Sequence, residues 1–272
     1  WKNACHSWKT LACCVNLIRF AGKNNKVIVQ EHKEFCSHSD EIKKIIVKNY
    51  KKASKVIVLT KYQITDYINN GISNIINIPN GITDNYLLLQ SVNNKKERKR
   101  IVSFGRLVEM KQFNILIESF STIAKKYPDW ILDIYGDGDQ KLALTKMITS
   151  LKLDSQIKIH PPTSLVYEEL YNSSFCVLTS SREGFGMVYI ESFSMGKPVI
   201  SFDIECGPKE FLKHEYNSLV SPCFDARHMA AQMERLINDK ELLSELGNNA
   251  RKTYLEQYEI SKVVHEFLRV CN

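Results

Sequence analysis

Short apolar runs alternate with amphipathic segments along most of the chain. The apolar runs are rich in β-branched residues and have the length of buried strands, whereas the segments between them repeat apolar residues every three or four positions, as helices do. This alternation predicts an α/β fold with parallel strands covered by helices. The expected strands span residues 26–30, 55–60, 75–79, 100–105, 130–136, 157–160, 175–180, 198–203 and 217–221.

A polar and basic stretch divides these strands into two groups. Residues 93–100 read NNKKERKR and are interpreted as a linker between domains. We therefore expect two Rossmann-like, doubly wound domains, the first incomplete, over residues 1–92 and 93–255, followed by a C-terminal helix over 256–272 that packs back toward the first domain. The chain begins inside a helical pattern, so we also expect that an N-terminal piece is missing.

The composition is that of a globular protein. Of 272 residues, 44% are hydrophobic and 25% are charged, and no run of about 18 apolar residues occurs. The first residues do not resemble a signal peptide, and the eight cysteines form no CxxC motif, so we expect reduced thiols and a cytoplasmic protein. His32, Cys36 and His38 lie close together in sequence, but three such residues without a partner pair are a weak signal, and no metal site is predicted.

The net charge of +7 favours a negatively charged partner. Within residues 41–52, Ile42, Ile46 and Tyr50 fall on one helical face and lysines occupy the rest. Either the apolar stripe packs on the protein's own core and the lysines are solvated, or the helix contacts an anionic membrane, which would be the inner face of the cell membrane. The lysines concerned are Lys43, Lys44, Lys48, Lys51 and Lys52.

Candidate ligand-binding residues follow several strands of the second group. In doubly wound sheets ligands bind beyond the carboxyl ends of the strands. Arg106 carries a planar fork of donors for phosphate oxygens and Lys111 a compact charge, a combination that suits a diphosphate. Neither a GxGxxG fingerprint nor a Walker motif is present, which argues against nicotinamide-dependent and P-loop enzymes. Further residues at these strand ends are Gly105, Gly136, His160 and Glu183.

The stretch SREGFGMVYIESFSMGKPVISFD, residues 181–203, predicts a loop, a helix from about Met187 and a strand. The helix entrance suits an anion because it presents free N–H groups and the positive end of the helix dipole. Glu183 lies in the loop and Glu191 inside the helix, so two carboxylates that accept hydrogen bonds from hydroxyls flank this entrance, as a sugar nucleotide requires. The alternative stays open that Glu183 is favoured by the dipole alone and Glu191 lies on a solvated face.

Several motifs in order resemble the retaining GT-B glycosyltransferases of glycosyltransferase family 4, in particular bacterial enzymes that build lipopolysaccharide, capsule or lipid-linked oligosaccharide. The resemblance extends from about Val27 to the end of the chain. Two departures concern Gln112, where many members have glycine, and His160 with the two prolines after it, which leaves base selectivity open. The motifs are NIPNGI (77–82), SFGRLVEMK (103–111), LDIYGDG (132–138), the Glu183 and Glu191 pair, GPKEF (207–211) and YNSLV (216–220).

The resemblance implies a role for each candidate residue. Arg106 and Lys111 would neutralise the donor's diphosphate, Glu183 would bind the donor sugar, and Glu191 would hold the ribose hydroxyls. His32 matches a histidine that reaches the donor sugar from the other domain, although a single histidine after a strand is often structural. The remaining donor-binding residues implied are Gly105, His160, Gly184, Phe185, Gly186 and Met187.

The implied activity is transfer of a sugar from a nucleoside diphosphate sugar, expected to be UDP-linked, to a glycan or lipid-linked acceptor with retention of configuration, and without a cofactor or metal. Related alternatives are a nucleotide-sugar epimerase or phosphorylase of similar fold, and a non-catalytic binder of nucleotide sugars. A nucleic-acid partner is not expected, because no aromatic residues interleave with the basic runs.

Overall fold

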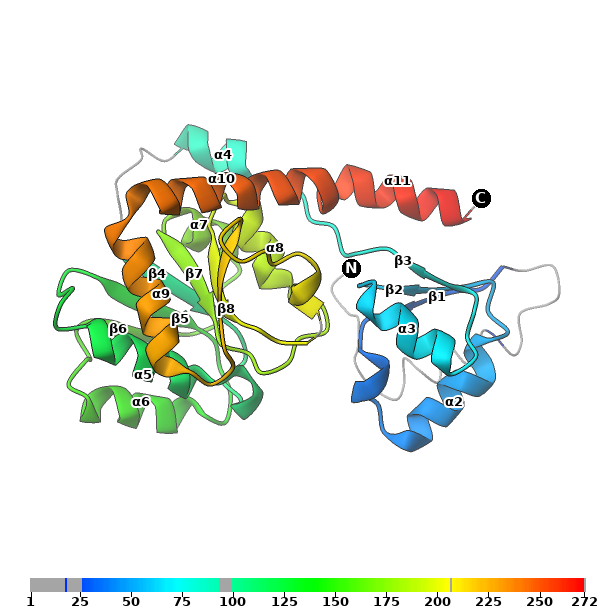
Figure 1. The fold of residues 1–272 in the computed structure, drawn as a ribbon, viewed down its shortest axis with the longest axis horizontal. Helices are drawn as coiled ribbons and strands as arrows, with labels where there is room; N and C mark the ends of the chain where they lie inside the picture. The colour runs from blue at the N-terminus through cyan, green and yellow to red at the C-terminus, as the bar shows by residue number, and fades with distance from the viewer. Residues whose placement is uncertain (1–17, 19–25, 93–98, 206, 272) are drawn as a thin grey trace. The chain divides into compact units, whose positions relative to one another are not determined.

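The structure is a computed structural model that describes residues 18, 26–92, 99–205 and 207–271 (Figure 1). The chain forms two compact units, of which unit 1 comprises Trp1–Asn80 with Ser261–Asn272 and unit 2 comprises Gly81–Ile260. Each unit contains a parallel β-sheet. The predicted α/β class, with two parallel sheets, is therefore confirmed.

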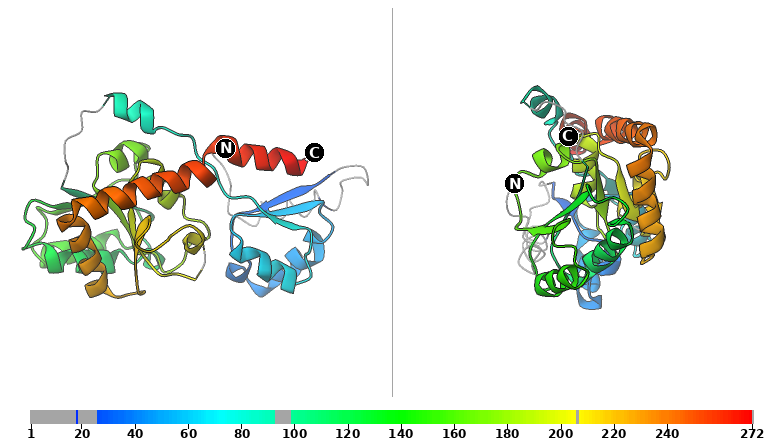
Figure 2. Two further views of the ribbon diagram at one scale, coloured as in Figure 1. Left: turned by 45° about the horizontal axis from the view of Figure 1, so that its top comes forward. Right: turned by 90° about the vertical axis from the view of Figure 1, so that its left-hand side faces the viewer.

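Unit 1 is built on a three-stranded sheet with the order β1-β2-β3. In-register apolar pairs such as Val29 and Val56 line the sheet, and α2 and α3 lie on one of its faces, as both views show (Figures 1 and 2). The elements are β1 (Ile28–Glu31), η1 (Phe35–Ser37), α2 (Asp40–Tyr50), β2 (Lys55–Val58), α3 (Tyr62–Asn69), β3 (Ile75–Asn77) and, from the end of the chain, α11 (Ile260–Cys271).

Helix α2 is the basic amphipathic helix expected from the sequence. Ser39 caps its first turn by accepting a hydrogen bond from the Ile42 backbone N–H at 3.4 Å. Ile46 and Tyr50 are fully buried in the core of unit 1, with Ile42 packed against that core, so the apolar stripe is covered by the protein itself. Exposed lysines remain on the opposite side of the helix and just after it, at Lys44, Lys48, Lys51 and Lys52.

Unit 2 contains a six-stranded parallel sheet with the order β6-β5-β4-β7-β8-β9. The chain adds β5 and β6 on one side of β4, then returns to add β7, β8 and β9 on the other side. The direction of strand addition thus reverses between β4 and β7. The strands are β4 (Arg100–Phe104), β5 (Ile131–Tyr135), β6 (Ile157–His160), β7 (Phe175–Leu178), β8 (Val199–Phe202) and β9 (Ser218–Ser221).

Helices cover both faces of this sheet (Figures 1 and 2). One face packs on α5, α6 and α9 to form the main apolar core, which includes Ile101, Leu132 and Phe120. On the other face α7 and α8 pack beside each other and α10 packs on α8. The helices are α4 (Tyr86–Val92), η2 (Glu109–Lys111), α5 (Phe113–Ile123), α6 (Lys141–Ser150), α7 (Val166–Tyr171), α8 (Met187–Ser194), η3 (Gly207–Glu210), α9 (Ala226–Asn238) and α10 (Lys240–Gln257).

The division between the units differs from the predicted one at residues 92 and 93, because residues 81–92 belong to unit 2. Ile82 donates its backbone N–H to the Tyr258 carbonyl at 3.0 Å and accepts from the Tyr254 hydroxyl at 3.0 Å. Asp84 forms an ion pair with Arg251, whose guanidinium lies 4.7 Å from the ring centre of Tyr86. These contacts with α10 and the residues after it attach the segment to unit 2.

Some sequence-based expectations concern residues outside the described ranges. They include the helical pattern at the start of the chain and most of the basic linker, residues 93–98. Among the described helices, none combines the length and the apolar character needed to span a membrane.

The packing of α10 on α8 predicts a strong effect of a small substitution. A Cβ atom at Gly247 would lie 2.5 Å from the Gly196 carbonyl oxygen, just after α8. We expect Gly247→Ala to lower the free energy of unfolding by about 1–3 kcal/mol because the backbones must separate, although alanine favours helix formation. Urea unfolding measures this, with Asn248→Ala, at an exposed position of the same helix, as the control. Equal or greater stability of Gly247→Ala would contradict the packing.

Candidate functional site

The reversal of strand order in unit 2 creates the place where a ligand site is expected. Connections from β4 and β7 leave the sheet in opposite directions, so a crevice opens beyond their carboxyl ends. The segment after β4 carries Gly105, Arg106 and Lys111, and the segment after β7 carries Glu183. Candidates that are about 70 residues apart in sequence are therefore neighbours in the fold.

Lys111 and Glu183 are in direct contact across this crevice. Lys111 Nζ forms an ion pair with Glu183 Oε1, and both side chains are largely buried, at 17% and 16% exposure. The same carboxylate oxygen accepts a hydrogen bond from the Ser180 hydroxyl at 2.7 Å. The two predicted residues thus form one charged, partly enclosed group.

Backbone contacts hold the two segments together beneath this ion pair. The Thr179 hydroxyl donates to the Lys111 carbonyl at 2.9 Å, and the Ser181 N–H donates to the Met110 carbonyl at 2.9 Å. On the far side, Gly207 begins η3 with φ of 64°, and a Cβ atom there would lie 2.2 Å from the Glu183 carbonyl oxygen. Only glycine allows η3 to approach the Glu183 loop this closely.

Arg106 and Gly105 occupy the β4 side of the crevice. Arg106 is exposed, and its guanidinium has no hydrogen-bond or ion-pair partner among the described residues. Gly105 lies under the Lys111 side chain, since a Cβ atom at Gly105 would be 3.5 Å from Lys111 Cε. An unpaired cation beside a paired one is compatible with a diphosphate site.

The entrance of α8 follows Glu183 directly. Gly186 precedes the helix with φ of 81°, and Met187, its first residue, is exposed. Phe185 is buried instead, with its ring centre 5.6 Å from that of Phe211 in an edge-to-face contact. The Phe185 side chain is therefore part of the core. The backbone of Gly184–Met187 and the exposed Met187 side chain remain available to a ligand, whereas the Phe185 side chain does not.

Glu191 lies one turn inside α8 and is largely buried. Burial raises the pKa of its carboxyl to about 7. The carboxylate has no hydrogen-bonding partner among the described residues. Burial, with the charge of Glu191 as a further cause, raises the pKa of Tyr167 to about 12, so the two side chains are close. A buried and unpaired carboxylate is costly to a fold and is typical of functional sites.

His160 ends β6, and its Nε2 lies 2.7 Å from Asp133 Oδ1. Its ring stacks on Tyr135 with centres 4.7 Å apart. His32, the other histidine predicted at the site, follows β1 in unit 1 and donates its backbone N–H to Glu31 Oε1 at 3.1 Å. The structure thus places His32 and the remaining candidates in different units.

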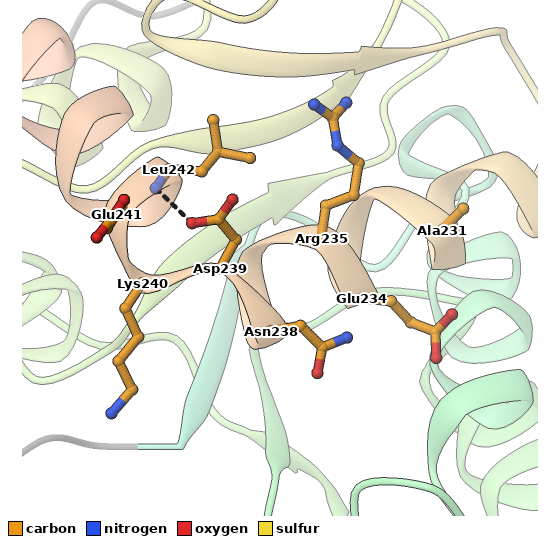
Figure 3. Close-up of a pocket in the computed structure, with 8 residues that line it drawn as sticks. All are labelled: Ala231, Glu234, Arg235, Asn238, Asp239, Lys240, Glu241 and Leu242. Atoms are coloured by element: carbon orange, nitrogen blue, oxygen red, sulfur yellow. Dashed lines mark hydrogen bonds between the residues drawn. The ribbon is translucent and has the colours of Figure 1, made fainter.

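Among the described residues, no group of three or more His, Cys, Asp or Glu side chains is arranged to hold a metal ion, and His32, Cys36 and His38 do not form such a group. A shallow hollow of about 780 Å³ lies where α9 meets α10, and none of the predicted site residues lines it. Figure 3 labels the residues that do, among them Arg235 and Lys240. In this hollow Asp239 caps α10 by accepting from the Leu242 N–H at 2.8 Å.

Sequence reasoning missed the residues that support the charged pair. Ser180 was visible as a polar residue after β7, but nothing in the sequence indicates its bond to Glu183. The sequence also does not indicate the steric role of Gly207, although Gly207 begins the motif GPKEF. Asp133 and Arg100, which contact each other and lead to His160, lie within strands and carried no ligand signal.

Comparison with known proteins shows the family. The model of the family "Glycosyl transferases group 1" matches residues 87–253. An uncharacterized glycosyltransferase of Haemophilus influenzae is 30% identical over 247 residues, covering 90% of this chain and 69% of that protein. The poly(ribitol-phosphate) alpha-N-acetylglucosaminyltransferase of Staphylococcus aureus is 28% identical over 256 residues, 93% of this chain and 51% of that enzyme. The chain thus spans about half the length of the second relative.

Solved structures agree with this relationship. A mutant of S. aureus TarM, in complex with fondaparinux, alpha-GlcNAc-glycerol and UDP, aligns with a TM-score of 0.79 and 28% identity over 92% of this chain and 51% of that one. Anabaena HepE, in complex with UDP, aligns with a TM-score of 0.85 over 97% of this chain and 76% of that one; at 20% identity it supports the fold alone. The fold is that of GT-B glycosyltransferases, and the chain belongs to the glycosyltransferase enzymes of the "Glycosyl transferases group 1" family.

Proposed function

We propose that this chain binds a nucleoside diphosphate sugar, UDP-linked, in unit 2 and transfers the sugar to a glycan or lipid-linked acceptor with retention of configuration. The observation that carries the proposal is the Lys111 and Glu183 pair at the crevice between β4 and β7. Further support comes from the relatives named as glycosyltransferases and from the UDP bound to the TarM mutant.

The charged groups suit the leaving diphosphate. Lys111 pairs with Glu183 just before the entrance of α8, where free N–H groups attract anions. Arg106 is a second cation, five residues before Lys111 in the same segment after β4. In the structure Lys111 is paired with Glu183, so a bound diphosphate would share this cation and free the Glu183 carboxylate for sugar hydroxyls. Preorganised charges that meet developing charge lower the barrier, and the loss of one such contact typically costs about 3–4 kcal/mol. No metal cofactor is part of the proposal.

The proposed step needs no protein nucleophile. The bond between the anomeric carbon and the diphosphate oxygen breaks, and a bond from the acceptor oxygen forms on the same face of the sugar. The acceptor's hydroxyl proton passes to an oxygen of the departing diphosphate. Arg106, Lys111 and the α8 amides stabilise the charge that remains on the phosphate, and His32 is proposed to contact the donor sugar.

Glu191 is proposed to bind the ribose, and this gives the direct test of the function. A buried carboxylate without a partner gains two hydroxyl donors when ribose binds, and hydrogen bonds to charged groups contribute about 1.5–3 kcal/mol. We expect UDP and UDP-sugars to raise the melting temperature of this chain and Glu191→Ala to weaken their affinity about 10- to 100-fold. Thermal shift and calorimetry measure both, with Glu245→Ala, at an exposed position of α10, as the control.

Product analysis with a labelled donor separates the catalytic alternatives. A new glycosidic bond only when acceptor is added supports transfer, whereas a change of the sugar without acceptor would indicate an epimerase. Binding without turnover by this chain would leave it a nucleotide-sugar binder. If no nucleoside diphosphate sugar binds to the unaltered chain, the proposal is wrong.

The raised pKa of Glu191 also predicts how stability depends on pH. Its pKa is about 7 in the folded chain and near 4.3 when unfolded, so between these values the folded state holds more protons. Stability therefore falls as pH rises from about 4.5 to 7, by on the order of 3 kcal/mol for this group. We expect the free energy of unfolding of Glu191→Gln to decrease less between pH 5 and pH 8 than that of the unaltered chain, as measured by urea unfolding. Identical pH dependence of Glu191→Gln and the unaltered chain would argue against a buried, unpaired carboxylate.

Contact with an anionic membrane is proposed through the exposed lysines of α2. Because Ile46 and Tyr50 are in the core, the contact would be electrostatic, contributing about 1 kcal/mol per lysine. We expect binding to vesicles with anionic lipid that weakens with salt and is reduced in Lys48→Ala/Lys52→Ala. The control removes equal charge from unit 2 in Lys146→Ala/Lys152→Ala. Equal binding by the two variants would refute a role for α2.

A further inference from the structure

Two consecutive hydroxyl groups follow β7 and hold the two partners of the charged pair in unit 2. Thr179 and Ser180 are each only 2% exposed. The Thr179 hydroxyl donates to the main-chain carbonyl of Lys111 at 2.9 Å, whereas the Ser180 hydroxyl donates to the side-chain oxygen Oε1 of Glu183 at 2.7 Å. The cation is therefore held at its backbone and the acid at its carboxylate.

The Lys111 ammonium can change partners while the main chain of Lys111 stays in place. Besides the Thr179 contact, the Lys111 backbone N–H donates to the Val108 carbonyl at 2.9 Å. Among the described residues, Glu183 is the one polar partner of Lys111 Nζ. Lysine carries a compact charge on a flexible stem, so the ammonium can turn from Glu183 to a phosphate oxygen without a shift of the segment after β4.

The Glu183 carboxylate keeps a second contact when the lysine leaves. Both Lys111 and Ser180 bind Oε1, and Oε2 has no hydrogen-bonding partner among the described residues. A carboxylate has about four lone-pair sites, so Oε2 and the site that Lys111 vacates can accept sugar hydroxyls while Ser180 still holds Oε1. A side chain that is already fixed loses little freedom when a ligand binds.

We propose that Thr179 and Ser180 are positioning residues with separate tasks. Thr179 sets the main chain of Lys111 so that its ammonium reaches the donor's diphosphate, and Ser180 keeps the Glu183 carboxylate in place for the sugar hydroxyls after Lys111 has left it. This inference rests on the proposed function, because it requires a nucleoside diphosphate sugar in unit 2. Hydroxyls that served only the fold would affect stability, and their loss would weaken every ligand alike.

The test separates the phosphate contacts from the sugar contacts. Calorimetry on the full chain and its variants measures the affinities for UDP, UDP-glucose and UDP-N-acetylglucosamine. The decisive quantity is the affinity ratio, defined as the affinity for the tighter of the two UDP-sugars divided by the affinity for UDP. Urea unfolding of each variant shows whether the fold is kept.

The two hydroxyls are expected to give opposite results. We expect Ser180→Ala to lower the affinity ratio about 5- to 20-fold and to leave UDP affinity within about 2-fold, because the loss affects Glu183 alone. We expect Thr179→Val, which keeps the shape of the side chain, to weaken UDP and UDP-sugars equally, by about 5-fold, with an unchanged ratio.

Three further variants make the comparison specific. Ser180→Thr retains a hydroxyl and is expected to keep most of the affinity ratio. Ser173→Ala is the matched control, since Ser173 is a buried serine just before β7 whose hydroxyl donates to the Leu170 carbonyl at 2.7 Å; we expect it to change neither quantity. If Ser180→Ala does not fold, Ser180→Cys replaces it, with a similar size and a weaker donor.

A double-mutant cycle tests whether Ser180 acts through Glu183. We expect Glu183→Ala to lower the affinity ratio because the proposed sugar contact is lost. Ser180→Ala/Glu183→Ala is then expected to have the same ratio as Glu183→Ala alone, since a positioning residue has no effect once its target is absent.

Several results would overturn the inference. An unchanged ratio in Ser180→Ala, an equal loss of affinity for UDP and UDP-sugars in that variant, or additive effects in the cycle would show that Ser180 does not position Glu183 for the sugar. A lowered ratio in Thr179→Val, or equal affinities of the unaltered chain for UDP and both UDP-sugars, would contradict the division of tasks. In all these cases binding of UDP by the unaltered chain keeps the proposed function intact, whereas absence of nucleotide binding would overturn both.

Discussion

The ion pair between Lys111 and Glu183 joins two segments that leave the sheet of unit 2 in opposite directions. It can form only because β4 and β7 are neighbours although the chain builds β5 and β6 between them. Thr179 and Ser181 tie the segments together below the pair, and Gly207 lets η3 close against the Glu183 loop. The reversal of strand order thus brings a cation, a carboxylate and a helix entrance to one place, and the proposed chemistry depends on that.

The two faces of the sheet in unit 2 differ in the buried groups that they carry. The sheet face toward α5, α6 and α9 carries the main apolar core. The face toward α7 instead carries Arg100, which pairs both with Asp133 on β5 and with Glu169 on α7. On α8, the Glu191 carboxylate has no hydrogen-bonding partner among the described residues. A satisfied network orients side chains, whereas an unsatisfied carboxylate raises the free energy of the empty site until a ligand supplies donors. This side of the sheet therefore combines the oriented Arg100 network with the Glu191 carboxylate, which can accept hydrogen bonds from a ligand.

The two units contribute differently to the proposed function. Unit 2 contains the family match, the crevice and nearly all candidate residues. Unit 1 contains His32 and the lysines of α2. The apolar side of α2 is buried in the core of unit 1, so only its basic side is exposed. A basic surface that is not needed for folding remains free to meet an anionic partner. The segment 81–92, held by Arg251 and by backbone bonds to the end of α10, belongs energetically to unit 2.

The periodicity of apolar residues determined the strands, most helices and the α/β class, because short-range pattern reports which face of each element is buried. Glycine and charge after β4 and β7 were enough to select Arg106, Lys111 and Glu183, since strand ends share one edge in any parallel sheet. The pattern could not supply the partners Ser180 and Gly207, the attachment of residues 81–92, or the path from Arg100 to His160. Those depend on contacts between residues far apart in sequence, which exist only once the strand order is set. The burial of Glu191 also depends on tertiary structure, because segments distant in sequence cover its side chain. This burial raises the pKa of the carboxyl, and the neighbouring residues in the chain do not predict it.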